Sequence, residues 1–208
     1  MWISSRPAVS GIVLAAGESQ RMGSPKALCN WGGSTFLQAV VAYLRDGGVR
    51  EIGIVLGAAE KEIREHGLPE GVEAWTNPEY KYGQLSSLQV GLRNQKMDVI
   101  GAVVALVDHP AVKPDTVRTL IRAIWDFPDR IVKPTYEGRG GHPILIGRKW
   151  WGEILSISFY DLDTTHSMIP TLRDILTRYP ERILSMETHD PGILLDIDTP
   201  EILSRHSS

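Results

Sequence analysis

The sequence predicts an α/β protein in which helices cover both faces of a mostly parallel sheet, giving three α/β/α layers. The main evidence is three short apolar runs, at residues 10–17 (SGIVLAAG), 51–57 (EIGIVLG) and 100–108 (IGAVVALVD). Their apolar residues are continuous rather than alternating, as in strands that are buried on both faces. Helical patterns lie between these runs, and strands that alternate with helices are typical of parallel sheets.

Four segments have the residue spacing of amphipathic helices: residues 34–48, 58–67, 84–95 and 114–127. We expect the first helix to begin at Ser34, which can act as a cap, and to stop at Gly47 and Gly48. Pro114 suits the first position of the fourth helix, because the missing N–H of proline is not needed there.

The second half of the chain is expected to extend the same sheet. Strand-like runs occur at residues 130–136, 138–147 and 192–198, with helices around residues 150–155 and 170–179. No Gly/Ser-rich linker, low-complexity tract or internal repeat divides the chain. We therefore predict a single domain over residues 1–208, with a first half at about 9–130 and a second half at about 131–205 that adds an antiparallel element.

Composition and charge exclude several classes of protein. The formal net charge of -3 gives no broad basic field, so nucleic-acid binding has no support. The single cysteine, Cys29, excludes an internal disulfide framework and any cysteine-clustered metal site. No apolar run approaches the roughly 20 residues of a membrane span, and residues 1–10 lack the apolar region of a signal peptide. We expect a cytoplasmic protein without a membrane partner.

The loop after the first apolar run has the composition of an anion-binding site. Ligands of open α/β sheets bind beyond the carboxyl ends of the strands, where Ala15, Ala16 and Gly17 stand. Small residues let backbone N–H groups approach phosphate oxygens, and Arg21 and Lys26 can neutralise a polyphosphate. Neither the G-x-G-x-x-G pattern of dinucleotide folds nor the G-x-x-x-x-G-K-[ST] pattern of P-loops occurs there. The alternative is an ordinary strand-to-helix turn whose two cations are solvated.

Carboxylates at later strand ends are candidate ligands of Mg2+. Asp108 closes an apolar run, and magnesium prefers carboxylate oxygens together with substrate phosphates. Asp196 and Asp198 are two residues apart, so on a strand both side chains would point to one side. One of them, for which we favour Asp198, can complete the metal site while the other caps a helix that starts at residues 199–201. The alternative for Asp108 is a turn-forming or helix-capping role before Pro110.

The entry to the helix at residues 84–95 is a further candidate site. Gly83 permits a close approach of the backbone, and Ser86 and Ser87 lie near the first helical turn. The free N–H groups of such a helix start can bind a phosphate or the edge of a base. The alternative is a surface helix that is capped by its serines.

Residues 137–147 (EGRGGHPILIG) place three glycines and Arg139 before His142. This composition is also that of a hairpin turn, with His142 packed or solvated. His109 and the pair Trp150–Trp151 either line a ligand pocket or belong to the core, where aromatic residues more often lie.

Four motifs together resemble one family of nucleotidyltransferases. The stretch LAAGESQRMGSPK, residues 14–26, is similar to the L-A-A-G-x-S-x-R-M-G-x-x-K signature of nucleotidyltransferases with a glycosyltransferase-A-like, Rossmann-like fold. Residues 77–91 resemble an N-x-x-x-x-x-G-x-x-x-S-L-x-x-G arrangement, and residues 141–145 resemble a G-H-P-x-L pattern. Residues 196–202 resemble the ending D-I-D-T-P-E-D, although Ile202 replaces its last aspartate. The chain thus resembles the MobA-like family, and within it the molybdenum cofactor cytidylyltransferase group.

The resemblance implies a role for each matched residue. The nucleotide-binding residues would be Leu14, Ala15, Ala16, Gly17, Arg21, Lys26, Asn77, Gly83, Ser86 and Ser87. The catalytic residues would be Arg21, Lys26 and Asp108. Asp108 and Asp198 would bind the metal, and His142 would contact the acceptor. The start L-A-A-G resembles the cytidylyltransferase branch, whereas guanylyltransferases of the same pathway have L-A-G-G, so CTP is the favoured nucleotide.

The implied reaction transfers CMP from CTP to the terminal phosphate of the molybdopterin cofactor, with Mg2+ as cofactor and pyrophosphate as product. The first half of the chain would bind the nucleotide and the second half the acceptor, and a molybdoenzyme would receive the product. Two alternatives stay open: CMP transfer to another phosphorylated small molecule, and a non-catalytic module that carries the finished cofactor. Residues 158–176 depart from the Gly- and Arg-containing pattern that the resemblance implies for the acceptor side.

Overall fold

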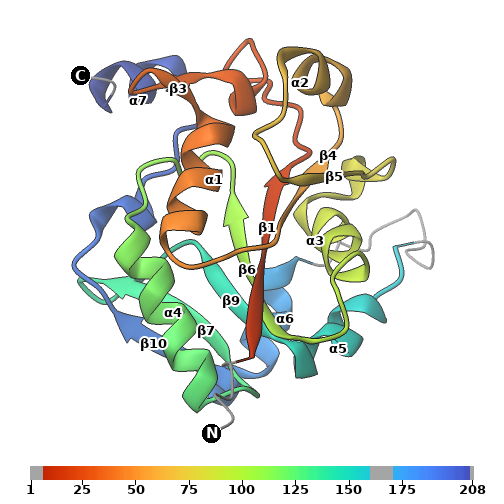
Figure 1. The fold of residues 1–208 in the computed structure, drawn as a ribbon, viewed down its shortest axis with the longest axis vertical. Helices are drawn as coiled ribbons and strands as arrows, with labels where there is room; N and C mark the ends of the chain where they lie inside the picture. Colours follow the sequence, from red (N-terminus) through yellow and green to blue (C-terminus); the bar gives the residue numbers. More distant parts are fainter. Residues whose placement is uncertain (1–6, 160–170, 207–208) are drawn as a thin grey trace, which may run out of the picture.

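The computed structural model describes residues 7–159 and 171–206, in which helices surround a central sheet (Figure 1). The strands of this sheet are β1 (Ala8–Ala15), β4 (Ile52–Leu56), β5 (Glu73–Thr76), β6 (Val99–Leu106), β7 (Ile131–Tyr136), β8 (Arg139–Gly140), β9 (Ile144–Gly147) and β10 (Ile183–Glu187). Their order is β10-β7-β9-β6-β1-β4-β5, with β8 paired to β7. β2 (Asn30–Trp31) and β3 (Ser34–Thr35) form a separate antiparallel pair.

Strand directions follow the sequence-based expectation. β1 lies between β4 and β6 and is parallel to both, and β5 continues the parallel part beyond β4. β9 is antiparallel to both of its neighbours, β6 and β7, whereas β10 pairs with β7 in parallel. The prediction of a mostly parallel sheet with an antiparallel element in the second half is therefore confirmed.

Helices cover both faces of the sheet, and the side chains of β1 alternate between them. The helices are α1 (Phe36–Asp46), α2 (Glu60–His66), α3 (Gln84–Arg93), α4 (Pro114–Asp126), α5 (Trp151–Leu155), α6 (Leu172–Arg178) and α7 (Pro200–His206). Val13 packs in one core with Phe36 of α1, whereas Ile12 packs in a second core with Leu88 of α3. The three-layer α/β/α prediction is confirmed. Within the described ranges, no helix combines the length and the apolar composition that crossing a membrane requires.

The start of α1 differs by one residue from the expectation. Thr35 is the cap: its hydroxyl accepts a hydrogen bond from the N–H of Gln38, and the Gln38 side chain accepts one from the N–H of Thr35. Ser34 lies in β3 instead, and its hydroxyl donates to the carbonyl of Trp31. The expected end at Gly47 and the expected first position of Pro114 in α4 are both confirmed.

The strand predicted at residues 192–198 is wrong. Residues 191–194 form a short 3-10 helix, and the last strand of the sheet is β10, which precedes it. The buried carboxylate of Asp190 accepts hydrogen bonds from the N–H groups of Gly192 (3.0 Å) and Lys113 (2.8 Å), which tighten this turn. The argument that a strand would point Asp196 and Asp198 to one side therefore fails.

Candidate active site

The carboxyl ends of β1 and β6 meet at one edge of the sheet, where the N–H of Val107 donates to the carbonyl of Leu14 over 3.2 Å. A cavity of about 200 Å³ opens at this edge. It is lined by most of the residues predicted to bind a nucleotide or a metal: Leu14, Ala15, Ala16, Gly17, Lys26, Gly83, Ser87 and Asp108. The small side chains of residues 15–17 leave the backbone open to a ligand.

The loop after β1 turns back on itself and brings Lys26 to the cavity. Ser19 and Gly23 have positive φ angles of 52° and 69°, the left-handed region in which glycine is favoured. The Ser19 hydroxyl accepts a hydrogen bond from the N–H of Lys26 over 3.0 Å, and its carbonyl accepts one from the N–H of Met22. Because Met22 is buried, the loop is anchored to the core while Lys26 faces the cavity.

Arg21, Lys26, Asp108 and Asp198 form one cluster of ion pairs, of which Lys26 and Asp108 line the cavity. The ammonium of Lys26 donates to Oδ2 of Asp108 over 2.8 Å and also pairs with Asp198. Arg21 forms a further ion pair with Asp198. Partial burial opposes the charge of Lys26, but Asp108 and Asp198 outweigh it and raise the pKa of Lys26 above its usual value. The site is thus a compact arrangement of two cations and two carboxylates from distant parts of the chain.

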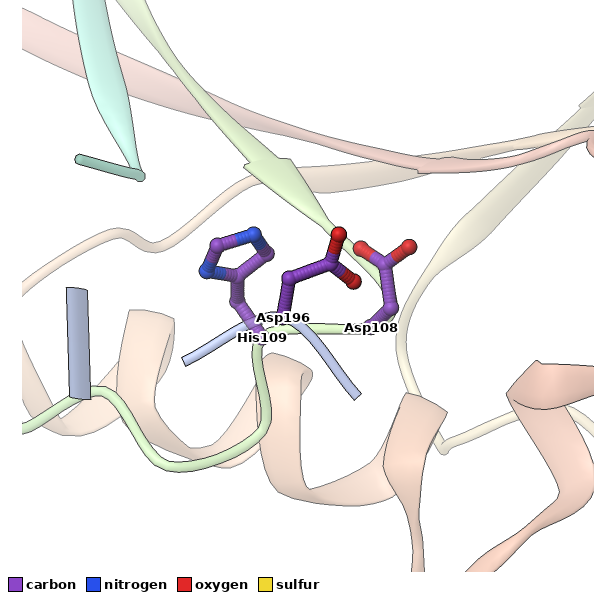
Figure 2. Close-up of side chains that lie close together, drawn as sticks. All are labelled: Asp108, His109 and Asp196. Atoms are coloured by element: carbon purple, nitrogen blue, oxygen red, sulfur yellow. The ribbon is translucent and has the colours of Figure 1, made fainter. Parts of the chain in front are cut away.

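Asp108 also belongs to a second group of side chains, shown in Figure 2. One ligand atom each from Asp108, His109 and Asp196 lie within 4.8 Å of one another, which suits a metal ion. Although residue Asp196 is exposed, partial burial of its carboxyl group and then the charges of Asp108 and Asp198 raise its pKa to about 7. A cation placed here would relieve this repulsion between carboxylates.

The sequence did not assign His109 to a metal, and it favoured Asp198 over Asp196 as the second carboxylate ligand. The side chain of His109 is buried, and burial lowers its pKa despite the nearby charge of Asp108, so the imidazole is neutral at pH 7. Nδ1 of His109 has no hydrogen-bond partner within the described part of the chain. The sequence feature that could have indicated His109 is its position directly after Asp108, just beyond the carboxyl end of β6.

Hydrogen bonds from neighbouring elements hold residues 190–198 beside Asp108. The N–H of Ile197 donates to the carbonyl of Asp108 over 2.9 Å, and the N–H of His142 donates to the carbonyl of Ile193. Asp190 accepts from the hydroxyl of Thr116 in α4 over 2.7 Å, in addition to its two backbone donors. Asp190 therefore fastens the segment that carries Asp196 to the body of the sheet.

We expect Asp190→Ala to lower the free energy of unfolding by about 2 to 4 kcal/mol, because it leaves buried donors without their charged acceptor. Denaturant titration followed by circular dichroism measures this change. Asp115→Ala is the matched control, since Asp115 lies exposed in the first turn of α4 and should change stability little. Equal destabilisation by the two variants would contradict the anchoring role of Asp190.

Asn77 and Ser86 are buried and do not line the cavity. The amide of Asn77 donates to the hydroxyls of Ser86 (2.9 Å) and Ser87 (3.0 Å), and its carbonyl accepts from the N–H of Glu79. The hydroxyl of Ser86 donates to the carbonyl of Gly83 over 2.8 Å. These bonds shape the entry to α3, at which Gly83 and Ser87 face the cavity.

A second and larger cavity, of about 990 Å³, shares Gly83 and Gln84 with the first. Its lining includes His142 and the cationic residues Lys81, Lys133 and Arg173. The ring of His142 lies 5.4 Å from that of His109, which links the wall of this cavity to the metal-binding group. Of residues 158–176, which the sequence associates with the acceptor, residues 160–170 lie outside the described part of the chain.

Trp150 and Trp151 belong to the core rather than to either cavity. Both side chains are buried, and their indole N–H groups donate to the backbone carbonyls of Asp129 and Ile146. Residues 137–140 belong to a hairpin between β7 and β8, which agrees with the hairpin interpretation of this stretch. His142, two residues further on, lies in the wall of the second cavity.

The fold is an open α/β sheet with a candidate ligand loop at its carboxyl edge, the place where ligands of such sheets bind. Residues 11–181 match the model of the MobA-like NTP transferase domain. The chain therefore belongs to the MobA-like NTP transferase family.

Relatives in this family carry several different names. A protein of Rubrobacter xylanophilus named bifunctional IPC transferase and DIPP synthase is 36% identical over 66% of this chain and 32% of its own length. The nicotine blue oxidoreductase of Paenarthrobacter nicotinovorans is 32% identical over 67% of this chain and 71% of its own. The molybdenum cofactor cytidylyltransferase of Escherichia coli K12 is 26% identical over 93% of both chains. The chain thus spans about a third of the first relative's length.

Solved structures share the whole fold. The crystal structure of Rv0371c from Mycobacterium tuberculosis H37Rv has a TM-score of 0.76 and 26% identity, and covers 98% of this chain and 100% of its own. The same protein in complex with manganese has a TM-score of 0.70 and 25% identity, over 96% and 98% of the two chains. The predicted nucleotidyltransferase fold is confirmed over nearly the full chain.

Proposed function

We propose that the chain transfers CMP from CTP to the terminal phosphate of the molybdopterin cofactor and releases pyrophosphate. The observation that carries this proposal is the cluster in which Lys26 pairs with Asp108 and Asp198 beside a cavity at the strand ends, with Arg21 paired to Asp198. The cytidylyltransferase of Escherichia coli supports the choice of reaction, because its similarity extends over 93% of both chains. The start L-A-A-G of the first loop supports CTP as the donor.

The first cavity is proposed to hold the nucleotide. Backbone N–H groups at residues 15–17 can bind phosphate oxygens, and the amino end of α3 at Gln84 adds further free N–H groups and a favourable dipole. Lys26 and Arg21 would exchange their carboxylate partners for the phosphates of CTP and stabilise the charge on departing pyrophosphate.

The residues beside this cavity fit a divalent cation. The carboxylates of Asp108 and Asp196 lie close together, and partial burial, followed by the charges of Asp108 and Asp198, raises the pKa of Asp196. The manganese complex of Rv0371c supports a metal requirement in this chain, for which Mg2+ is the sequence-based hypothesis. When bound, such an ion neutralises negative charge on the phosphates.

The second cavity is proposed to hold the acceptor. Its volume of about 990 Å³ admits a large ligand, and Lys133 and Arg173 can bind its phosphate. A phosphate monoester is largely ionised at neutral pH, since its second pKa is about 6, so the chain needs no general base to create the nucleophile. His142 lies in the wall, and burial, followed by the proximity of His109, lowers its pKa to about 4, so it would contact the acceptor as a neutral imidazole.

Two other functions belong to the same proposal as alternatives. The first is CMP transfer to a different phosphorylated small molecule, which the varied names of the relatives keep open. The second is a non-catalytic carrier of the finished cofactor. The cations and carboxylates at the first cavity favour catalysis, because a protein that only carries the finished cofactor does not need to bind a metal ion and a polyphosphate. A recipient molybdoenzyme, a cytoplasmic location and a single domain over residues 1–208 stay predictions.

We expect pyrophosphate release only when CTP, a divalent cation and the molybdopterin cofactor are all present. The measurement is a coupled pyrophosphate assay with CTP, GTP, ATP and UTP in parallel, each with and without the acceptor. CTP should exceed GTP by at least about tenfold, which corresponds to about 1.4 kcal/mol of discrimination. Release from CTP with a sugar phosphate in place of the cofactor would establish the first alternative. Absence of release with every nucleotide, while the finished cofactor binds, would establish the carrier.

A further inference from the structure

Two consecutive glycines, Gly140 and Gly141, line the second cavity for different reasons. A Cβ atom at residue 141 would lie 2.2 Å from the carbonyl oxygen of Ile193, so the backbone itself excludes a side chain there. A Cβ atom at residue 140 would instead meet the end of the Lys133 side chain, 2.2 Å from Cε and 2.6 Å from Nζ. The fold therefore requires glycine at residue 141, whereas glycine at residue 140 makes room for the Lys133 ammonium.

His142 connects this ammonium to the first cavity. Lys133 lies on β7, which pairs with the strand that ends at Gly140, and His142 follows two residues later. Burial is the main cause of the low pKa of His142, and the charge of Lys133 lowers it further, whereas Asp108 acts in the opposite direction. The ring of His142 lies 5.4 Å from that of His109, the residue after Asp108. A phosphate held by Lys133 would thus lie at the end of the second cavity that is nearest to Asp108.

The rest of the lining is cationic or apolar. Lys81 and Arg173 add two exposed cations, and within the described part of the chain no Asp or Glu lines this cavity. Among residues 7–159 and 171–206, no carboxylate forms an ion pair with Lys133. An ammonium that lacks a carboxylate and is partly withdrawn from water attracts a phosphate more strongly than an exposed one. The apolar part of the wall consists of Leu85, Ile144, Leu172, Leu176, Pro180 and Ile183.

We propose that Lys133 makes the specific contact with the acceptor phosphate, and that glycine at residue 140 is what places its ammonium there. The ligand class is a phosphomonoester whose body is largely apolar, with the phosphate at Lys133 and the body against the apolar wall. Lys81 and Arg173 add only a general attraction for anions, because both are exposed. The inference rests on the proposed function in placing the acceptor in the second cavity, and it is independent of the nucleotide.

Calorimetric titration of the full chain with phenyl phosphate, without nucleotide or metal, tests the contact. The wild-type protein should bind phenyl phosphate more tightly than ribose 5-phosphate, because only the former carries its phosphate on an apolar ring. Lys133→Met should lower the affinity at least about tenfold. Gly140→Ala should lower it at least about fivefold, since its methyl group displaces the ammonium without removing the charge. Arg173→Met should change it by less than about threefold.

Matched controls separate the contact from general effects. Lys149→Met removes an exposed lysine, and Gly152→Ala places its methyl group in open space, so neither should change the affinity. Lys26→Met should keep the wild-type affinity, because Lys26 belongs to the first cavity. Thermal unfolding of Gly140→Ala should match the wild type, since the displaced atoms are the end of a flexible side chain.

Several outcomes would overturn the inference. They are no binding of phenyl phosphate to the wild-type protein, undiminished binding by Lys133→Met or Gly140→Ala, and a larger loss in Arg173→Met than in Lys133→Met. Loss of binding in Lys26→Met would place the probe in the wrong cavity, and equal affinity for ribose 5-phosphate would refute the apolar class. Pyrophosphate release is measured separately, so binding of phenyl phosphate as expected, without release from any nucleotide, would contradict only the proposed function.

Discussion

Replacement of Lys26 with methionine is expected to slow pyrophosphate release by about 10²- to 10³-fold, as for loss of one preorganised donor to a developing charge. Lys26 lines the nucleotide cavity and contacts two carboxylates, so its charge lies at the centre of the cluster. Methionine keeps the length and most of the apolar stem. The measurement is the rate of pyrophosphate release at saturating CTP, together with the KM for CTP.

Lys61→Met is the matched control for this variant. The Lys61 side chain is 87% exposed on α2 and pairs with Glu65 on the same helix, so its replacement should leave the rate unchanged. The Mn2+ affinity of the Lys26 variant should not fall, because the change removes a cation that competes for Asp108. Activity within about threefold of wild type in the Lys26 variant would remove Lys26 from the catalytic machinery.

The second large effect is expected for Asp108→Asn. Asp108 is the residue common to the cation cluster and the metal-binding group, since it accepts from Lys26 and lies within 4.8 Å of ligand atoms of His109 and Asp196. Asparagine keeps the shape but loses the charge, so both metal binding and alignment of Lys26 should suffer. We expect pyrophosphate release to fall by about 10³-fold or more, and metal affinity to fall with it.

Asp98→Asn is the control for Asp108, because Asp98 is exposed just before the amino end of β6, the same strand that Asp108 follows. It should leave both measurements unchanged. A folded Asp108 variant that binds Mn2+ as tightly as wild type would refute the assignment of Asp108 as a ligand. Thermal unfolding of both variants shows whether a loss of activity reflects the site or the fold.

Most of the sheet was predictable because its central strands bury both faces. Continuous apolar runs identify β1, β4 and β6, since each contributes side chains to both cores. The edge strand β10 was missed because its residues are only partly buried and carry no continuous apolar run. Residues 192–198 mislead in the opposite direction: Ile193 and Ile197 are fully buried, yet they belong to an irregular segment. An apolar run therefore predicts burial of its side chains, but it does not show whether the backbone is a strand or an irregular segment.

The candidate site was predictable where it depends on strand ends, and not where it depends on irregular backbone. The ends of parallel strands share one edge of the sheet, which brings Lys26 from the loop after β1 to Asp108 after β6. The separate positions of Asp196 and Asp198 follow from the path of the segment after β10, which no periodicity encodes. Similarly, the environment of His109 depends on Asp196, a residue 87 positions away in sequence.

The position of β6 has a consequence for recombining members of the family. β6 is hydrogen-bonded to β1 on one side and to β9 on the other, and Asp108 follows its last residue. A chimera joined near residue 130 would pair a β6 from one parent with a β9 from the other. Such a hybrid tests whether the register between β6 and β9 is kept. A shift in this register would move Asp108, which follows β6, relative to His142, which precedes β9 in the wall of the second cavity.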